Sequence, residues 1–162
     1  MDVIKAPNPI RLMRGEPAFF LAGSIEMGAA ADWQVWVTQE LQKIFPKTGV
    51  VMNPRRDSWD SSWKQDTTNP QFREQVWWEL TALEKSDVIG VYFDPDTKSP
   101  VTLLELGLYA QSGKAVVCCP EGFWRKGNVD LVCRRYGVTL VDDLSLLASM
   151  MARTYEGLHI EV

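Results

Sequence analysis

Short apolar runs alternate with amphipathic stretches along this chain, and this alternation restricts its fold more than any other feature. The runs predict buried strands, and stretches whose apolar residues recur every three to four positions predict helices. Strands that alternate with helices form a parallel sheet with helices on both faces. We therefore expect a three-layer α/β sandwich with a five-stranded parallel sheet. The predicted strands are 18–23, 48–54, 88–93, 115–120 and 138–143, and the predicted helices are 30–45, 70–87, 99–114, 128–137 and 144–157.

The length of the chain fits one domain built on one core. It has 162 residues, without internal repeats, low-complexity tracts or linkers. Hydrophobic residues make up 46% and charged residues 23%, which is typical of a soluble globular protein. We expect a single domain over 1–162, in which residues 1–17, with three prolines, form an N-terminal arm.

Charge and composition exclude several classes of function. A net charge of −4 disfavours nucleic acid as a partner, and no apolar run is long enough to cross a membrane. The N-terminus lacks the apolar core of a signal peptide. Three cysteines, two of them adjacent, do not form a disulfide framework, so we expect a reducing, cytoplasmic setting. One histidine leaves little from which to build a metal site or a Ser-His-Asp triad, so acid–base chemistry must rest on carboxylates.

The loop after the first predicted strand is a candidate ligand-binding turn. In parallel α/β sheets, ligands bind at the carboxyl ends of the strands, where the strand order switches. Gly23 and Ser24 form a strand-to-helix turn whose backbone N–H groups can bind an oxygen-rich ligand. The alternative is a turn that only makes a tight bend. The segment lacks the G-x-G-x-x-G and G-K-[ST] patterns, so neither dinucleotide nor P-loop binding is indicated.

A long polar loop with the sequence "NPRRDSWDSSW" follows the second predicted strand. Long loops in compact domains are usually functional or disordered. Asp57, Trp59, Asp60 and Trp63 offer carboxylates beside indole faces, which suits stacking on and hydrogen bonding to a flat heterocycle. The alternative is a loop that folds over the core and plugs it with its tryptophans.

Glu105 is an unexpected carboxylate in the predicted helix 99–114. Val101, Leu104 and Leu108 share one side of that helix with Glu105, and this side is expected to face the core. An unpaired buried carboxylate is costly, so Glu105 either has a cationic partner or faces a cavity. Its place early in the helix favours the ionised form.

Two further observations bear on the carboxylates of the chain. Lys98, Lys114 and the nearby arginines are the candidate partners if Glu105 forms a structural salt bridge. On the predicted helix 70–87, Glu79 lies about 60° from the centre of the apolar face and can reach inward. The alternative for Glu79 is an ordinary solvated glutamate.

Several segments, in this order, resemble the nucleoside 2-deoxyribosyltransferase family and its relatives, the nucleoside and nucleotide N-glycoside hydrolases. The resemblance covers 19–137 and rests on "LAGSI", "ELTALEKSDVIGVYF" and "SPVTLLELGLYAQSGKAVVC". The segments "NPRRDSWD" and "FWRKGNVD" are most similar to the subgroup called nucleoside 2-deoxyribosyltransferase-like. Only the ordered set is specific, since an isolated Glu-Leu-Gly occurs in many proteins.

The resemblance implies a flavodoxin-like fold, no cofactor, and a homodimer or larger homo-oligomer with a shared active site. It makes Glu105 the nucleophile that attacks the anomeric carbon of the sugar, and it places Glu79 near the reaction centre. Ser99 falls where members of the family hold the 5′ end of the sugar. Asn128 corresponds to an asparagine that reaches into the site of the neighbouring subunit. The expected partners are a small-molecule nucleoside and a free base.

Three departures from the family pattern qualify these expectations. Glu79 stands in place of an aspartate, and Phe20 lies near a position where a tyrosine often supports the nucleophile, so Tyr92 or Tyr109 would have to supply that hydroxyl. Glu26 stands where relatives that hold a 5′-phosphate carry a basic residue, which favours a free nucleoside over a nucleotide.

The chemistry of N-glycosidic cleavage agrees with carboxylates as the reacting groups. One carboxylate traps the oxocarbenium-like sugar, a second group protonates the leaving base, and retention requires the two about 5 Å apart. Glu79, Asp57 or Asp60 suits the second role. The first hypothesis is a nucleoside deoxyribosyltransferase and the second is an N-glycoside hydrolase. The third, from another class, is a non-catalytic nucleotide- or sugar-binding module.

Overall fold

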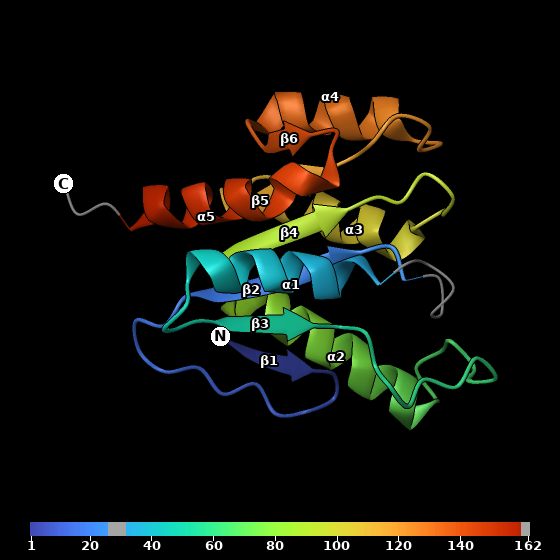
Figure 1. The fold of residues 1–162 in the computed structure, drawn as a ribbon. Helices are drawn as coiled ribbons and strands as arrows, with labels where there is room; N and C mark the ends of the chain where they lie inside the picture. The colour runs from blue at the N-terminus through green and yellow to red at the C-terminus, as the bar shows by residue number, and fades with distance from the viewer. Residues whose placement is uncertain (26–31, 160–162) are drawn as a thin grey trace.

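The computed structural model describes residues 1–25 and 32–159, and within them a six-stranded parallel sheet carries the fold (Figure 1). The strands lie in the order β1-β3-β2-β4-β5-β6. The strands are β1 (Asp2–Lys5), β2 (Ala18–Gly23), β3 (Val50–Asn53), β4 (Val88–Tyr92), β5 (Ala115–Cys118) and β6 (Thr139–Val141). The helices are α1 (Trp33–Ile44), α2 (Pro70–Lys85), α3 (Pro100–Tyr109), α4 (Lys126–Tyr136), the 3₁₀ helix η2 (Leu144–Leu146) and α5 (Leu147–Leu158).

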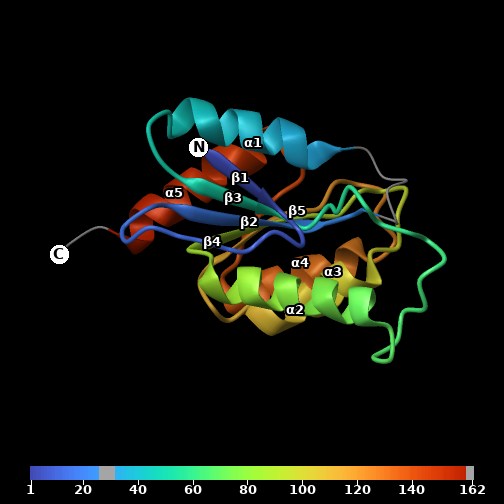
Figure 2. The same cartoon turned by 90° about the horizontal axis from the view of Figure 1, so that it is seen from below.

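Helices cover both faces of the sheet, as expected. Helices α1 and α5 lie on one face, and α2, α3 and α4 lie on the other (Figure 2). Strands β3-β2-β4-β5-β6 follow the flavodoxin-like order, in which the first strand of the motif lies between the second and the third. The predicted three-layer α/β class and its parallel sheet are confirmed.

The expected number of strands is wrong by one, because the N-terminal arm contributes β1. Asp2 pairs with Val50 and Lys5 with Asn53, so the arm adds a parallel strand beside β3. Further along the arm, the Trp78 indole N–H donates to the Asn8 carbonyl at 2.7 Å. Four residues beside a proline-rich segment carry too little apolar pattern to be recognised as a strand, and only pairing with β3 makes them one.

Alternate side chains of each strand enter two separate apolar clusters. Phe19 and Leu21 pack toward α1 and α5, whereas Phe20, Val91 and Phe93 pack toward α2, α3 and α4. These five side chains are at most 1% exposed. The sheet is therefore buried on both faces, as expected of a parallel sheet.

The switch in strand order falls between β2 and β4. The chain leaves β2 through α1 toward β3, and it returns through α2 on the opposite face to β4. Ligands bind in the crevice that such a switch creates at the carboxyl ends of the strands. Gly23 ends β2 there, and a Cβ atom at this position would lie 2.5 Å from the Tyr92 carbonyl oxygen and 2.6 Å from the Trp33 ring. Only glycine permits this close approach.

The expected core-facing side of α3 is wrong. Val101, Leu104 and Leu108 are 57%, 64% and 57% exposed, whereas Glu105 and Leu106 are buried with Thr102. Hydrophobicity alone assigned the most apolar side to the core, but α3 is apolar on nearly all sides. The side that carries Glu105 packs toward the sheet, and the leucine side is left at the surface.

Disulfide bonds and membrane-spanning helices are both absent among the residues that the structure describes. Cys118, Cys119 and Cys133 are buried and form no disulfide with one another. Over residues 1–25 and 32–159, every helix is too short or too polar to span a bilayer.

Candidate active site

Three hydroxyl groups meet at the switch point between β2 and β4. The Ser24 hydroxyl lies 2.8 Å from the Thr97 hydroxyl and 2.6 Å from the Ser99 hydroxyl, and the last two lie 2.8 Å apart. The Asp94 backbone N–H donates to the Ser24 hydroxyl at 2.9 Å, and the Thr97 hydroxyl donates to the Asp94 carbonyl at 2.9 Å. Two of the predicted binding residues, Ser24 and Ser99, thus come together from segments 75 residues apart.

Ser99 adopts a backbone conformation that serine rarely has. Its φ angle of 45° lies in the left-handed region. It occupies the N-cap position of α3, as predicted, but its side chain makes no capping hydrogen bond to the helix. The strained backbone instead turns the hydroxyl into the cluster with Ser24 and Thr97, and such strain is concentrated at functional sites.

Glu105 lies on the buried side of α3 without a cationic partner. It is 8% exposed, and none of the ion pairs between described residues includes it. The proposed salt bridge to Lys114 is absent, because the Lys114 ammonium donates to the carbonyls of Glu84 and Ser86 at 3.1 and 2.8 Å. Lys114 thereby satisfies the C-terminal end of α2, which is a structural role.

Burial, helped by the charge of Glu79, raises the pKa of Glu105 to about 8. The expectation that the helix N-terminus keeps this carboxyl ionised is therefore wrong. The field of a helix terminus fades beyond the first turn, and Glu105 is six positions after the N-cap residue Ser99. Desolvation outweighs that weak field.

Glu79 on α2 provides the second carboxyl of the site. Burial of the carboxyl group raises the pKa of Glu79 to about 7, although the residue as a whole is partly exposed. The Gln75 side-chain N–H donates to its Oε1 at 2.9 Å, which opposes part of that shift. The electrostatic effect of Glu79 on Glu105 indicates that the two carboxyls of α2 and α3 act on one another. The pair therefore retains at least one proton at neutral pH.

The two candidate aspartates of the long loop have other partners. The Lys5 ammonium donates to the Asp57 carboxylate at 2.7 Å, and this carboxylate is largely exposed. The Asp60 carboxylate accepts hydrogen bonds from the Ser62 side chain and, at 2.8 Å, from the Ser62 backbone N–H, and these two bonds lower the pKa of Asp60. An acid with a lowered pKa is a poor proton donor at neutral pH. Of the candidate donors, Glu79 has the suitable pKa.

The two half-buried tryptophans of the loop pack on each other. Trp59 and Trp63 meet edge to face, with ring centroids 5.1 Å apart, and the Arg56 guanidinium lies 5.1 Å from the Trp63 ring. Arg56 also donates to the Glu74 carboxylate of α2 at 2.9 Å. The loop thus folds against α2. The role of Trp59 in stacking on a base stays a prediction.

Asn128 lies apart from these groups, in the first turn of α4. Its side chain is exposed, and its backbone N–H donates to the Arg125 carbonyl at 2.9 Å. An exposed position agrees with a role toward a second subunit, which stays a prediction. Glu26, whose charge favours a free nucleoside, lies outside the described residues.

The tyrosines expected to compensate for Phe20 are placed differently. Tyr92 packs against Trp33, with ring centroids 5.3 Å apart, on the α1 and α5 face of the sheet. Glu105 lies on the opposite face, so the hydroxyl of Tyr92 is unsuited to support it. Tyr109 packs at the edge of the cluster under α3.

Two polar residues of the site were not predicted from the sequence. Gln75 is 5% exposed and contacts Glu79, and Thr97 is 7% exposed and completes the hydroxyl cluster. The spacing of four residues between Gln75 and Glu79 on one helix was the available signal. Thr97 offered none, because its place depends on the turn that follows β4.

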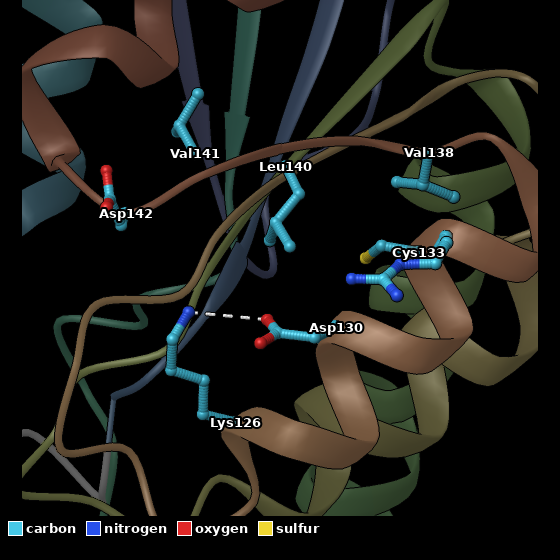
Figure 3. A pocket seen from close by; sticks show the side chains of 8 residues that line it. Lys126, Asp130, Cys133, Val138, Leu140, Val141 and Asp142 are labelled. Atoms are coloured by element: carbon cyan, nitrogen blue, oxygen red, sulfur yellow. Dashed lines mark hydrogen bonds and ion pairs between the residues drawn. The ribbon is translucent and has the colours of Figure 1, made fainter.

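A cavity lies elsewhere, at the β6 edge of the sheet. It measures about 500 Å³ and lies between α4 and β6 (Figure 3). Lys126 and Asp130, one turn apart on α4, form an ion pair at 3.3 Å at its wall, and Lys126 also donates to the Cys119 carbonyl. Arg134 and Asp142 line it too, and none of the ion pairs between described residues includes them. This cavity holds none of the residues that the sequence predicted for the site. Among the described residues, no three His, Cys, Asp or Glu side chains are arranged to hold a metal ion.

The fold and the site define a class of protein: a flavodoxin-like α/β protein with a hydroxyl cluster at the switch point of its sheet and two buried carboxyl groups, on α2 and α3, whose pKa values are raised. The chain belongs to the nucleoside 2-deoxyribosyltransferase like family, whose model matches residues 16–123, more than half of the chain. This match includes the hydroxyl cluster and both carboxyls, and it ends before α4. The resemblance noted in the sequence is thereby confirmed.

Solved structures add support for the fold alone. A conserved protein from Enterococcus faecalis V583 is similar, with a TM-score of 0.60 and 13% sequence identity. The similarity covers 85% of this chain and 98% of that one. No curated protein matches the chain.

Proposed function

We propose that the chain cleaves the N-glycosidic bond of a deoxynucleoside and transfers the sugar to a second base, with Glu105 as the nucleophile and Glu79 as the proton donor. The observation that carries this proposal is a pair of buried carboxyl groups on α2 and α3, of which Glu79 acts electrostatically on Glu105, and neither forms an ion pair with a described residue. Structural carboxylates acquire ionic partners when buried, whereas reacting ones are kept free of them.

The reaction takes place in two balanced steps. In the first, a Glu105 oxygen bonds to the anomeric carbon, the C–N bond breaks, and its electron pair stays on the base. Glu79 gives its proton to that base. In the second, a nitrogen of another base attacks the anomeric carbon and releases Glu105. The proton lost by this nitrogen returns to Glu79, so the enzyme is restored.

The reaction requires the form of the pair in which Glu79 holds one proton and Glu105 is ionised. Because Glu105 has the higher pKa, this form is the less populated of the two singly protonated forms. With pKa values of about 7 and about 8, the pair moves between doubly and singly protonated forms around neutral pH. When the pair loses its second proton at higher pH, no acid remains to protonate the leaving base. The rate of transfer is therefore expected to have a bell-shaped dependence on pH.

The test is a base-exchange assay with deoxynucleosides and ribonucleosides, each with and without a second free base, analysed by chromatography. A new nucleoside that forms only with the second base, and not with Glu105→Ala, supports the proposal. Release of free base without an acceptor would show that the chain is a hydrolase and not a transferase. If the wild-type chain turned over neither nucleosides nor their monophosphates, the chain would be a non-catalytic binding module.

The exposed side of α3 supports a homodimer as the functional unit. Glu105 is the only charged residue of α3 and is buried, so the outer side with Val101, Leu104 and Leu108 is free of charge. Two copies can meet there without desolvating a charge. Trp77 of α2 and Leu131 of α4, each 65% exposed, lie in the same helix layer.

The size of this apolar surface also favours a second copy. The three α3 side chains expose on the order of 300 Å², comparable with the largest patch on a typical monomer. With the flanking residues, two copies approach the roughly 1,000 Å² of total buried surface that a specific interface requires. Sedimentation velocity tests the proposal, and a monomer at every concentration would contradict it.

A further inference from the structure

Gln75 is the buried polar residue next to the carboxyl pair, and its side-chain amide has a defined orientation. Nε2 donates to the Pro54 carbonyl at 2.8 Å and to Glu79 Oε1 at 2.9 Å. The Pro54 carbonyl can only accept, so the amide nitrogen must face it in either protonation state of Glu79. The amide links the segment after β3 to α2, at the place where Glu79 enters the site.

Gln75 restricts where Glu79 can carry a proton. Oε1 of Glu79 accepts the amide hydrogen of Gln75, which occupies that oxygen. A carboxyl group that accepts on one oxygen is protonated preferentially on the other. The proton of Glu79 is thus directed to Oε2, the oxygen that Gln75 leaves available.

We propose that Gln75 is a positioning residue, which holds Oε1 of Glu79 so that Oε2 presents the proton to the leaving base. This inference rests on the proposed function for the reaction itself, but the hydrogen bond can be tested without turnover. No other residue of this chain donates to Glu79 among those that the structure describes. If the Glu79 carboxyl group rotated, it would still carry a proton, but the proton would no longer point toward the leaving base.

The neighbours of Glu79 define what a pH profile will report. Glu105 on α3 is the titratable group coupled to Glu79, and Gln75 on α2 and Pro54 after β3 are uncharged. Arg56, from the same loop as Pro54, pairs with Glu74 at 2.9 Å. The hydrogen bond from Gln75 favours the ionised form of Glu79, so its loss moves the pKa of Glu79 upward.

The experiment is a double-mutant cycle of Gln75→Met and Glu79→Gln. Methionine fills a similar volume without donating a hydrogen bond, and Gln71→Met, exposed on the same helix, is the matched control. We expect Gln75→Met to lower kcat about tenfold with KM changed less than twofold, and to move the limb of the pH profile due to Glu79 upward. Gln75→Met should have no further effect on kcat in the Glu79→Gln background, because the group that it positions is gone.

A purely structural role for Gln75 gives a different result. The same loss of kcat in both backgrounds, or a loss equal to that of Gln71→Met, would overturn the proposal. If Gln75→Met does not fold, Gln75→Asn replaces it in the cycle, because the shorter amide keeps its polarity but cannot reach Glu79.

Carbon-13 NMR of the glutamate carboxyls separates this inference from the proposed function. Glu79→Gln assigns the Glu79 signal, and the pKa of that signal is then compared between the wild-type chain and Gln75→Met. An upward shift of about half a unit or more supports the hydrogen bond even if no nucleoside turns over, a result that would contradict the proposed function alone. An unchanged pKa of Glu79 would overturn the role of Gln75.

Discussion

The two helix layers of this molecule differ in whether they bury a carboxyl group. The layer of α1 and α5 buries Val37, Leu41 and Met151 completely against the sheet, and the polar residue that it buries, Gln34, is uncharged. The layer of α2, α3 and α4 buries Glu105 as well as Gln75, and it leaves Leu104, Leu108 and Leu131 more than half exposed. Apolar burial, the main driving force of folding, explains most of the first arrangement. The second arrangement costs free energy in the isolated chain and therefore indicates function.

The strongest test of this contrast is Glu105→Gln. The amide keeps the size of the side chain but cannot attack the anomeric carbon, so base exchange should fall by a factor of about 10³ or more. The matched control is Glu84→Gln, an exposed glutamate of α2, which should leave the rate within twofold of wild type. Initial rates at saturating nucleoside measure both. If Glu105→Gln retained a tenth of the activity, Glu105 would not be the nucleophile.

A substitution in the core of the α1 and α5 layer should lower the stability of the chain and leave its rate of base exchange unchanged. Leu41→Ala removes a fully buried side chain between α1 and the sheet, and we expect it to lower the free energy of unfolding by about 2 to 5 kcal/mol. The folded fraction should keep its rate of base exchange, because no site residue lies in this cluster. Urea denaturation followed by circular dichroism gives the first quantity. A change in kcat of the folded variant would show that the two layers are coupled.

The sequence predicts the first layer better than the second, for a physical reason. Strand and helix periodicity report which residues bury apolar surface, and this correctly located five of the strands and the helices. The same signal misplaced the outer side of α3, because it assigns the most apolar side to the core. It also missed β1, which depends on pairing with β3, and Thr97, which depends on a turn. Local periodicity does not report contacts that depend on tertiary packing.

The outer side of α3 offers the next test. Leu104→Glu places a charge at the centre of the exposed apolar surface, and it should weaken self-association at least about 30-fold, the effect of losing a central contact. Ile44→Glu is the control, because Ile44 is also exposed and apolar but lies on α1, in the other layer. Sedimentation velocity over a range of concentrations measures both variants. Equal weakening by Ile44→Glu would show that the partner surface does not belong to the α3 side.

The smallest expected effect is a dependence of stability on pH that only the second layer produces. The pKa of Glu105 is about 8 in the folded chain and near 4.5 in the unfolded chain, and that of Glu79 is raised to about 7. Below about pH 4.5 both states hold these protons, so the carboxyls do not affect folding. Between pH 4.5 and 8 the unfolded chain loses protons that the folded chain retains, so the free energy of unfolding falls with rising pH.

Glu105→Gln should remove much of that loss. At pH 8 we expect the variant to exceed wild type in the free energy of unfolding by about 1 to 3 kcal/mol, and at pH 4.5 to be close to it. Denaturation at the two pH values measures the difference, with Glu84→Gln again as the exposed control. A variant less stable than wild type at pH 8 would mean that Glu105 stabilises the fold as an ion. Its burial without a cation would then need a structural explanation, and the contrast between the two layers would disappear.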